Sequence, residues 1–230
     1  MVFGSRPNLR SVPTIEVRFR GETLRPERSV RNLGVIFDST LSWDDHVAHV
    51  VRKCFGMLIA LSHIRHYLPQ RVIPTVVHGL VLSHVRYCIT VFGNCTGKNH
   101  RQLQKIIHFC ARIVAGRRKF DHISDILKGP DWFTSTQLSD YHTLSLAHRT
   151  LRWGEPAPIA SIFIKSLNLR IRQTRQDESF YLPRIRSEAG RRQFAYRAPQ
   201  LYNGLPVELT ALKHDAFKKN LRLYLKREYE

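Results

Sequence analysis

The sequence has few cysteines and few acidic residues. Only 4 of its 230 residues are cysteine, which is too few for a disulfide framework and favours a reducing, intracellular compartment. It has 18 Asp and Glu against 37 Lys and Arg, so the formal net charge is +19 at pH 7. A positive field of this size attracts polyanions. We therefore expect nucleic acid as the partner and a location in the nucleus or cytoplasm, not secretion.

Long apolar runs are also lacking. The most apolar stretch, residues 72–91, is interrupted by Pro74, His78, His84 and Arg86, and no run approaches the ~20 residues of a membrane span. The chain starts without a charged leader and apolar core, so we expect neither a secretory signal nor a membrane partner. It has no Gly-rich phosphate loop and no nucleophile elbow, and no small-molecule substrate is expected.

Residues 1–38 are predicted to form strands. Apolar and charged side chains alternate from Ile15 to Phe19, which is the period of a half-buried strand. Residues 30–37 form a second extended run, with Gly34 inside it. Since a sheet this short is marginal in water, we expect residues 1–38 to be the least protected part of the chain.

Residues 42–167 are predicted to form a helical domain. Ser42 is a good N-cap for a first helix that carries Asp44 and Asp45 in its first turn. Apolar side chains then recur at helical spacing along one face. The same periodicity predicts further helices from Pro69 toward Tyr87, over residues 98–115 and over residues 136–153.

Residues 168–230 are predicted to be different again. The stretch 168–200 contains eight Arg and no Lys, with Pro183 and Pro199 among its breakers, which is typical of a long loop or partly ordered arm. An amphipathic helix is expected over residues 215–229. The predicted fold class is therefore mainly α with a small N-terminal β element, a helical domain and an Arg-rich C-terminal region.

The helix expected over residues 98–115 carries the most informative pattern. Its spacing places five basic side chains on one face: Lys98, Arg101, Lys105, His108 and Arg112. Residues 98–119 include no Asp or Glu, and three more basic residues follow the helix: Arg117, Arg118 and Lys119. A solvated helix face usually mixes charges to form i,i+4 pairs. This face therefore indicates contact with phosphates.

The Arg-rich stretch adds Arg191 and Arg192 to the candidate nucleic-acid-binding residues. Guanidinium groups bind phosphate through two hydrogen bonds and stack on bases. Aromatic side chains interleave with the Arg residues, at Phe180, Tyr181, Phe194, Tyr196 and Tyr202. Such rings can serve as stacking platforms for single strands, but anchoring to the core is the favoured role for most of them.

No catalytic residue, metal site or cofactor is expected. Asp44 and Asp45 could suggest a magnesium-binding pair, but acids also stabilise the positive end of a helix, and no third carboxylate is placed to complete a site. The Cys and His residues between positions 88 and 110 lack the short Cys-x-x-Cys spacing of structural zinc.

Several short motifs together resemble one family. In chain order they are MVFG (1–4), VRNLGVIFD (30–38), LSWDDHV (41–47), YC (87–88), VFG (91–93), LQK (103–105), AR (111–112), GEP (154–156), APQLYNGLP (198–206) and FK (217–218). Their order and spacing resemble the non-LTR (LINE-type, jockey-like) retrotransposon reverse transcriptases, downstream of the catalytic palm motifs. The resemblance covers nearly the whole chain, although Phe92 stands where the family often has Trp.

The resemblance implies roles by position. Residues 1–4 resemble the end of the last palm strand, and residues 15–38 resemble the primer-grip hairpin that positions the growing DNA 3′ end. The helices from Ser42 onward resemble a thumb, which clamps the template–primer duplex by its backbone. The family's catalytic carboxylates, including the Tyr/Phe-x-Asp-Asp pair, are not in this chain. The resemblance thus implies a truncated element that is inactive alone, whose parent polymerase would use magnesium.

The predicted function is binding of template–primer nucleic acid, an RNA/DNA or DNA duplex, by a thumb-like helical bundle of an RNA-directed DNA polymerase. Two alternatives stay open. One is a free-standing basic nucleic-acid-binding protein domesticated from a retroelement. The other is a helical interaction module with no nucleic-acid role. A steep salt dependence of duplex binding would favour the thumb-like bundle or the domesticated binding protein over the helical interaction module.

Overall fold

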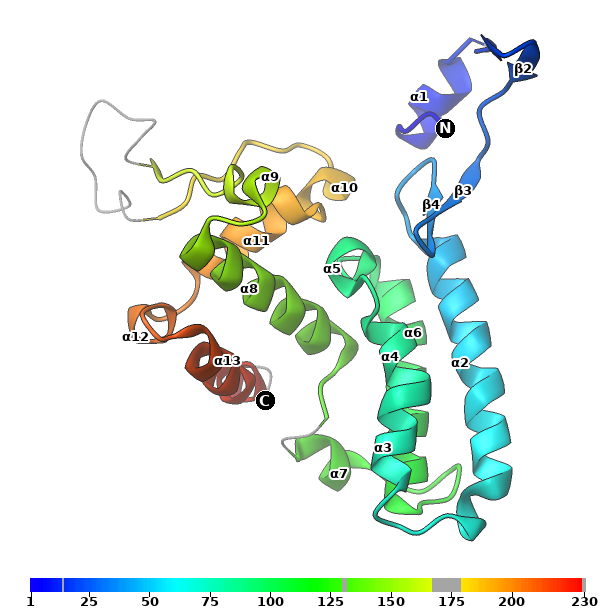
Figure 1. The fold of residues 1–230 in the computed structure, drawn as a ribbon, viewed down its shortest axis with the longest axis vertical. Coiled ribbons are helices and arrows are strands. Elements are labelled where there is room, and N and C mark those ends of the chain that lie inside the picture. Colours follow the sequence, from blue (N-terminus) through cyan, green and yellow to red (C-terminus); the bar gives the residue numbers. More distant parts are fainter. Residues whose placement is uncertain (14, 130–131, 167–178, 229–230) are drawn as a thin grey trace.

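The computed structural model describes residues 1–230 except 14, 130–131, 167–178 and 229–230. Helices make up most of the described chain, and its strands lie at the N-terminal end (Figure 1). The prediction of a mainly α fold with a small N-terminal β element is confirmed.

The N-terminal strands form two separate antiparallel hairpins. In the first, β1 (Val17–Phe19) pairs with β2 (Glu22–Leu24), and in the second, β3 (Ser29–Asn32) pairs with β4 (Val35–Asp38). The expectation of one extended run over residues 30–37 is wrong, because Leu33 and Gly34 reverse the chain with φ of 45° and 84°. A short helix, α1 (Arg6–Ser11), also lies where only strands were expected.

Three helical segments pack side by side and form the main core (Figure 1). They are α2 (Asp44–Ile64), α6 (Gly97–Ala115) and a continuous segment made of α3 (Ile73–Val77), the π-helical turn η2 (His78–Leu82) and α4 (Ser83–Arg86). A 3-10 turn, η1 (Arg65–Tyr67), follows α2, and α5 (Ile89–Phe92) precedes α6. Each segment buries an apolar stripe, so the helical periodicity read from the sequence corresponds to the core.

The first helix begins differently from the expectation. Ser42 is not its N-cap: Trp43 occupies that position with φ of 67°, and α2 begins at Asp44. The carboxylate of Asp38, at the end of β4, accepts hydrogen bonds from the backbone N–H groups of Ser42 at 3.0 Å and Trp43 at 2.7 Å. The strand end therefore caps the two residues that lead into α2 and joins the second hairpin to the helix, while the side chain of Trp43 makes no cap hydrogen bond to α2.

Helix α8 (Ser135–Trp153) connects the main core to the C-terminal part. It begins with a capping box between Thr134 and Gln137 and ends at Gly154, which has φ of 72°. Its side chains contribute to all three apolar clusters of the described residues. The remaining helices are α7 (Ser124–Lys128), α9 (Ala157–Ala160), α10 (Glu188–Arg191), α11 (Phe194–Asn203), α12 (Val207–Thr210) and α13 (His214–Glu228).

The C-terminal part is more ordered than a loop or arm. Residues 188–191 form α10 and residues 194–203 form α11, although Pro199 lies inside α11. Phe180 packs edge-on against Phe163 and Tyr202, with ring centroids 5.3 and 5.7 Å apart, so these aromatics anchor the segment. Three of the eight Arg residues counted in the sequence, Arg170, Arg172 and Arg175, lie outside the described residues.

The predicted amphipathic helix at the C-terminal end is present as α13. Phe217, Leu221 and Leu225 are buried against Leu144 of α8. Two of the neighbouring basic side chains face a ring, since the guanidinium of Arg222 and the ammonium of Lys226 lie 5.3 and 5.9 Å from the ring centre of Phe133.

One described helical stretch, Asp44–Tyr67, is long and apolar enough to cross a membrane, with a mean hydropathy of 1.3 over an 18-residue window. No such stretch was expected from the sequence. A single stretch of this kind is weak evidence, because the core helix of a soluble protein passes the same test and one side of α2 lies in the core. The absence of a membrane partner stays a prediction.

Candidate nucleic-acid interface

Helix α6 positions the predicted basic face. The hydroxyl of Thr96 accepts a hydrogen bond from the backbone N–H of Asn99 at the start of the helix, and Gly116 ends it with φ of 71°. Its apolar face is buried against α2 and α3. The opposite side of α6 is left to the basic residues.

The five predicted side chains on α6 are not equivalent. Lys98, Arg101 and Lys105 are exposed, whereas His108 and Arg112 are half-buried. Burial, followed by the charge of Arg112, lowers the pKa of His108, so its imidazole is neutral near pH 7. The Nε atom of Arg112 is buried and has no hydrogen-bond partner among the described residues. The freely accessible charge is therefore concentrated in the first half of the helix.

An acid from the neighbouring helix lies close to this face. Lys98 Nζ is 3.8 Å from a carboxylate oxygen of Asp44, and the amide of Asn99 donates to Asp44 at 2.9 Å. Both groups are partly exposed, so the ion pair is weak. Residues 98–119 contain no acid, but Asp44 of α2 places a carboxylate beside them in the folded protein. Lys98 is therefore less available to a ligand than Arg101 or Lys105.

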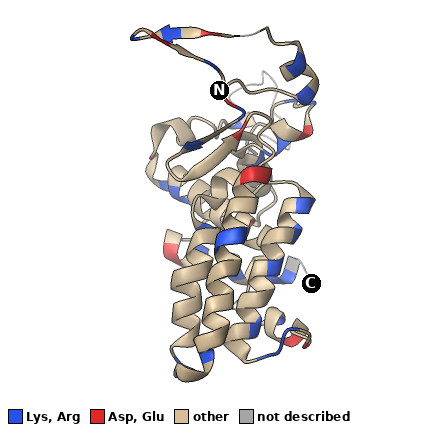
Figure 2. Ribbon diagram, turned by 90° about the vertical axis from the view of Figure 1, so that its right-hand side faces the viewer, with Lys and Arg blue, Asp and Glu red and all other residues tan. Residues whose placement is uncertain are grey.

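The basic residues after α6 continue the positive surface. Arg117 pairs with Asp125 at 3.2 Å, and both side chains are exposed. Arg118 and Lys119 are exposed, and the ammonium of Lys119 lies 5.3 Å from the ring centre of Phe120. Figure 2 shows Lys and Arg recurring along the described chain, with few Asp and Glu between them.

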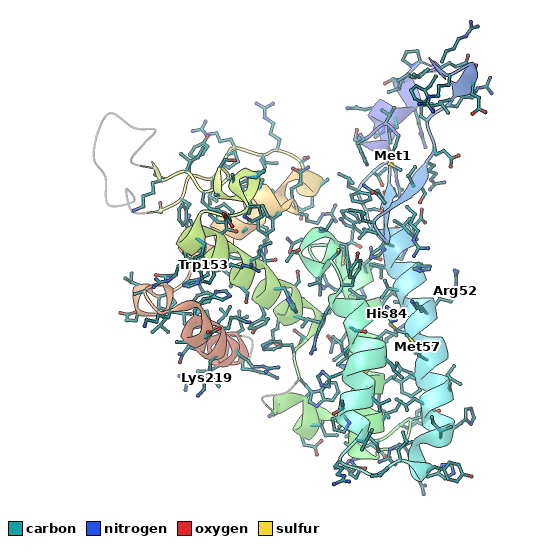
Figure 3. The ribbon with its side chains drawn as sticks, in the orientation of Figure 1. Met1, Arg52, Met57, His84, Trp153 and Lys219 are labelled. Atoms are coloured by element: carbon teal, nitrogen blue, oxygen red, sulfur yellow. The ribbon has the colours of Figure 1, made fainter. Side chains whose placement is uncertain are left out.

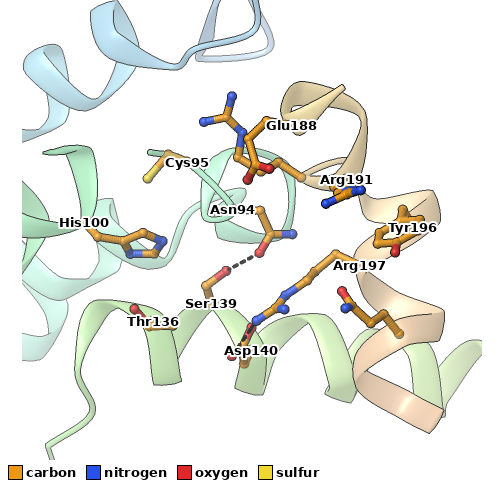
Figure 4. A pocket seen from close by; sticks show the side chains of 12 residues that line it. Asn94, Cys95, His100, Thr136, Ser139, Asp140, Glu188, Arg191, Tyr196 and Arg197 are labelled. Atoms are coloured by element: carbon orange, nitrogen blue, oxygen red, sulfur yellow. Dashed lines mark hydrogen bonds and ion pairs between the residues drawn. The ribbon is translucent and has the colours of Figure 1, made fainter. Parts of the chain in front are cut away.

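Arg191 and Arg192 lie at a different place. They line a cavity of about 360 Å³ between α8, α10, α11 and the start of α6, together with His100 and Glu188 (Figure 4). The lining of this cavity does not include Lys98, Arg101 or Lys105. The structure therefore does not bring the two candidate sets together in one site.

The same cavity contains a structural ion pair that the sequence did not reveal. The guanidinium of Arg197 donates to both carboxylate oxygens of Asp140, at 3.1 and 3.2 Å (Figure 4). Asp140 is 1% exposed, and Arg197 belongs to the stretch expected to be a loop or arm. This pair fixes α11 on α8, so Arg197 has a structural role in addition to its charge.

Arg65 is a further basic residue that was not among the expected site residues. It follows α2 directly, and its Nε donates to the carbonyl of Ile113 at 2.7 Å, near the end of α6. Gln70 supports the same helix end by donating to the carbonyl of Val114 at 2.7 Å. No sequence signal could have found Arg65, because its neighbours on α6 are almost fifty residues further along the chain.

The cysteines behave as core residues. Cys54 and Cys110 are fully buried, and Cys95 is 6% exposed. Burial raises the pKa of Cys54 to about 11 and that of Cys95 to about 12, so neither thiol is reactive near pH 7. Within the described residues, no group of three or more His, Cys, Asp or Glu is arranged to hold a metal ion.

Comparison with protein-family models, with curated proteins and with solved structures finds no match to this chain. The geometry of the basic surface and the resemblance seen in the motifs are therefore the grounds for assigning a function.

Proposed function

We propose that this chain is the primer-grip and thumb part of a non-LTR retrotransposon reverse transcriptase and binds the backbone of a nucleic-acid duplex. The observation that carries the proposal is the pair Arg101 and Lys105. They are exposed one helical turn apart on α6, and neither makes an ion pair among the described residues. Cations left unpaired beside a net charge of +19 favour phosphate as their partner.

Recognition in this proposal is of shape and charge. Arg101 and Lys105 approach the phosphates directly, and Arg118 and Lys119 extend the contact beyond the end of the helix. Lys98 contributes less to phosphate binding because its ammonium also interacts with the carboxylate of Asp44. Contacts to the sugar–phosphate backbone position a protein without reading bases, so binding is expected to depend steeply on salt and little on sequence.

Polymerisation is not part of the proposal for this chain. Two-metal phosphoryl transfer needs clustered carboxylates. The sequence has one consecutive Asp pair, Asp44 and Asp45, which lies in the first turn of α2, and Asp44 is engaged by Asn99 and Lys98. A thumb contributes by holding duplex near a catalytic site supplied by other residues.

The experiment compares two double variants that remove the same charges from different helices. The test variant is R101Q with K105Q, and the matched control is R52Q with K219Q. Arg52 projects outward from α2 and Lys219 lies on α13 (Figure 3), and both are exposed. Duplex affinity is measured by fluorescence anisotropy over a range of salt concentrations.

If α6 holds the duplex, the test variant lowers the slope of log affinity against log salt by about 1.8, since each lost contact lowers it by about 0.9. The control leaves the slope within about 0.5 of the parent protein. Equal losses in the two variants would mean that the overall charge attracts nucleic acid without a defined interface. A search of the genomic reading frame upstream for an Asp-Asp motif separates the reverse transcriptase from a domesticated binding protein.

A further inference from the structure

A groove of about 750 Å³ opens between the second half of α2 and the second half of α6. Its floor is apolar, and its side chains come from both helices and from the residue that follows Lys119: Phe55, Ile59, Phe109, Ile113 and Phe120. The rings of Phe55 and Phe109 are 6.1 Å apart and tilted by 47°. Ile59 is 51% exposed and Phe120 is 87% exposed. The apolar side chains of Ile59 and Phe120 are therefore exposed to solvent.

The rim of the groove is basic. Five Lys and Arg residues line it, together with His108, and no acid does: Arg65, Lys105, Arg112, Arg117 and Lys119. Arg65 is held in place by its hydrogen bond to the carbonyl of Ile113. Gly116 leaves room for it, because a Cβ there would meet the guanidinium of Arg65. The rim is therefore partly preorganised for anionic groups.

We propose that this groove binds an acidic amphipathic helix of another protein. Leucine-like side chains on one face of such a helix, spaced at i, i+3, i+4 and i+7, would cover Ile59, Phe109 and Phe120. Carboxylates beside that face would meet the cations of the rim. The proposal goes beyond duplex binding, with which it shares the side chains of Lys105 and Lys119.

The chemistry of the lining disfavours a nucleobase in the groove. A base presents polar edges with both donors and acceptors, and those edges need both acceptors and donors as partners when they are covered. Ser62 and His108 are the neutral polar side chains in the lining, and the hydroxyl of Ser62 already donates to the carbonyl of Ile59 at 2.7 Å. The five Lys and Arg side chains of the rim offer donors and no acceptor. The lining offers cations and hydrocarbon, which suit carboxylates and aliphatic side chains.

A second copy of this chain is disfavoured by charge, since each copy carries 37 Lys and Arg against 18 Asp and Glu. A flat lipid surface is disfavoured by shape, because the apolar floor lies between two helices and not on a convex face. An acidic helix satisfies the shape, the apolar floor and the charge of the rim together.

The test uses a synthetic helix with Leu at i, i+3, i+4 and i+7 and Glu at most other positions, labelled for fluorescence anisotropy. A scrambled peptide of the same composition is the control for charge. The protein variants are I59E, in the floor, and I64E, which is on the same helix, is 50% exposed and does not line the groove. Circular dichroism checks that both variants fold.

We expect I59E to weaken binding of the amphipathic peptide at least about tenfold, because a carboxylate would replace part of the apolar floor. I64E introduces the same charge outside the groove and stays within about twofold of the parent. Equal binding of the scrambled peptide, or equal effects of I59E and I64E, would overturn the proposal. A single-stranded oligonucleotide or phosphatidylserine vesicles are also tested as competitors of the peptide. If one of them binds the parent protein and I64E but not I59E, the groove is assigned to that ligand instead.

Discussion

The two N-terminal hairpins are alike in local structure and opposite in burial. Each pairs two short antiparallel strands, and each turns through two residues of positive φ: Arg20 and Gly21 in the first, Leu33 and Gly34 in the second. All residues of β1 and β2 are exposed, whereas Val35 and Asp38 of β4 are 3% and 6% exposed. Turn geometry therefore makes a hairpin but does not decide whether it joins the core.

The second hairpin is docked by three contacts that the first lacks. The backbone N–H of Ile36 donates to Nδ1 of His46 at 3.3 Å, and the hydroxyl of Tyr87 donates to the carbonyl of Leu33 at 2.8 Å. The carboxylate of Asp38 accepts hydrogen bonds from the backbone of the two residues that lead into α2. Within residues 15–38, which resemble a primer grip, the structure thus holds the second half on the helices and leaves the first half standing away from them (Figure 1).

The largest expected effect comes from removing the cap. Burial alone would raise the pKa of Asp38, but hydrogen bonds from Thr40, Ser42 and Trp43 lower it on balance. Asp38→Ala leaves several backbone donors without a partner at a buried helix start, so we expect the free energy of unfolding in urea to fall by about 3 kcal/mol. Asp38→Asn keeps an acceptor and should cost less. A loss below about 1 kcal/mol for the alanine variant would mean that the cap does not hold the hairpin.

Acidification should loosen the same hairpin through His46. Burial first, and then the charges of His49 and Arg31, lower the pKa of His46 from 6.5 to about 4. Between these values the unfolded chain binds more protons, so the free energy of unfolding falls as the pH drops, by about 2 kcal/mol at pH 5 from this group. Protonation of Nδ1 also removes the acceptor for Ile36.

The measurement compares the parent protein with His46→Asn at pH 7 and pH 5. Asparagine offers an oxygen near the position of Nδ1 and does not titrate. Other buried histidines, including His142 with a pKa lowered to about 4, titrate in both proteins, so the difference between them isolates His46. Identical pH dependence in the two proteins would contradict the assignment.

A matched pair of phenylalanines compares the hairpins directly. Phe37 in β4 packs edge-on against Trp43 with ring centroids 5.2 Å apart, whereas Phe19 in β1 is 59% exposed. We expect Phe37→Ala to lower the free energy of unfolding by about 1.5 kcal/mol and Phe19→Ala by less than about 0.5 kcal/mol. Equal losses would show that the first hairpin is also covered in solution.

The long helices could be predicted because their signals are local. Apolar side chains at a period of 3.6 and the glycines at 116 and 154 placed α6 and α8 within a residue of their observed bounds. Helix α13 could be predicted for the same reason, because Phe217, Leu221 and Leu225 recur at helical spacing and form its buried stripe.

The missed elements depend on contacts between distant residues. Helix α11 continues across Pro199, and Arg197 in it pairs with the buried Asp140 of α8, an interaction that spans 57 residues. In the candidate interface, the spacing of basic residues on α6 was readable, but the burial of Arg112 was not. Arg112 lies in a groove that is also lined by side chains of α2, including Phe55, and these residues are far from it in the sequence.

Amide hydrogen exchange compares the stability of the two hairpins in the parent protein without any substitution. An isolated two-stranded hairpin is marginally stable in water, so the amides that pair Val17 with Leu24 should exchange nearly as fast as those of an unfolded chain. The amides that pair Val30 with Phe37 should be protected, because opening β3–β4 also uncovers Val35 and breaks the contact of Ile36 to His46. Protection should then rise further in α2 and α6, which form the main core. This pattern divides residues 1–38 near the start of β3, whereas the sequence alone predicted residues 1–38 together as the least protected part of the chain. Strong protection of β1–β2 in a dilute monomer would mean that its apolar side chains are covered, and the contrast between the two hairpins would no longer hold.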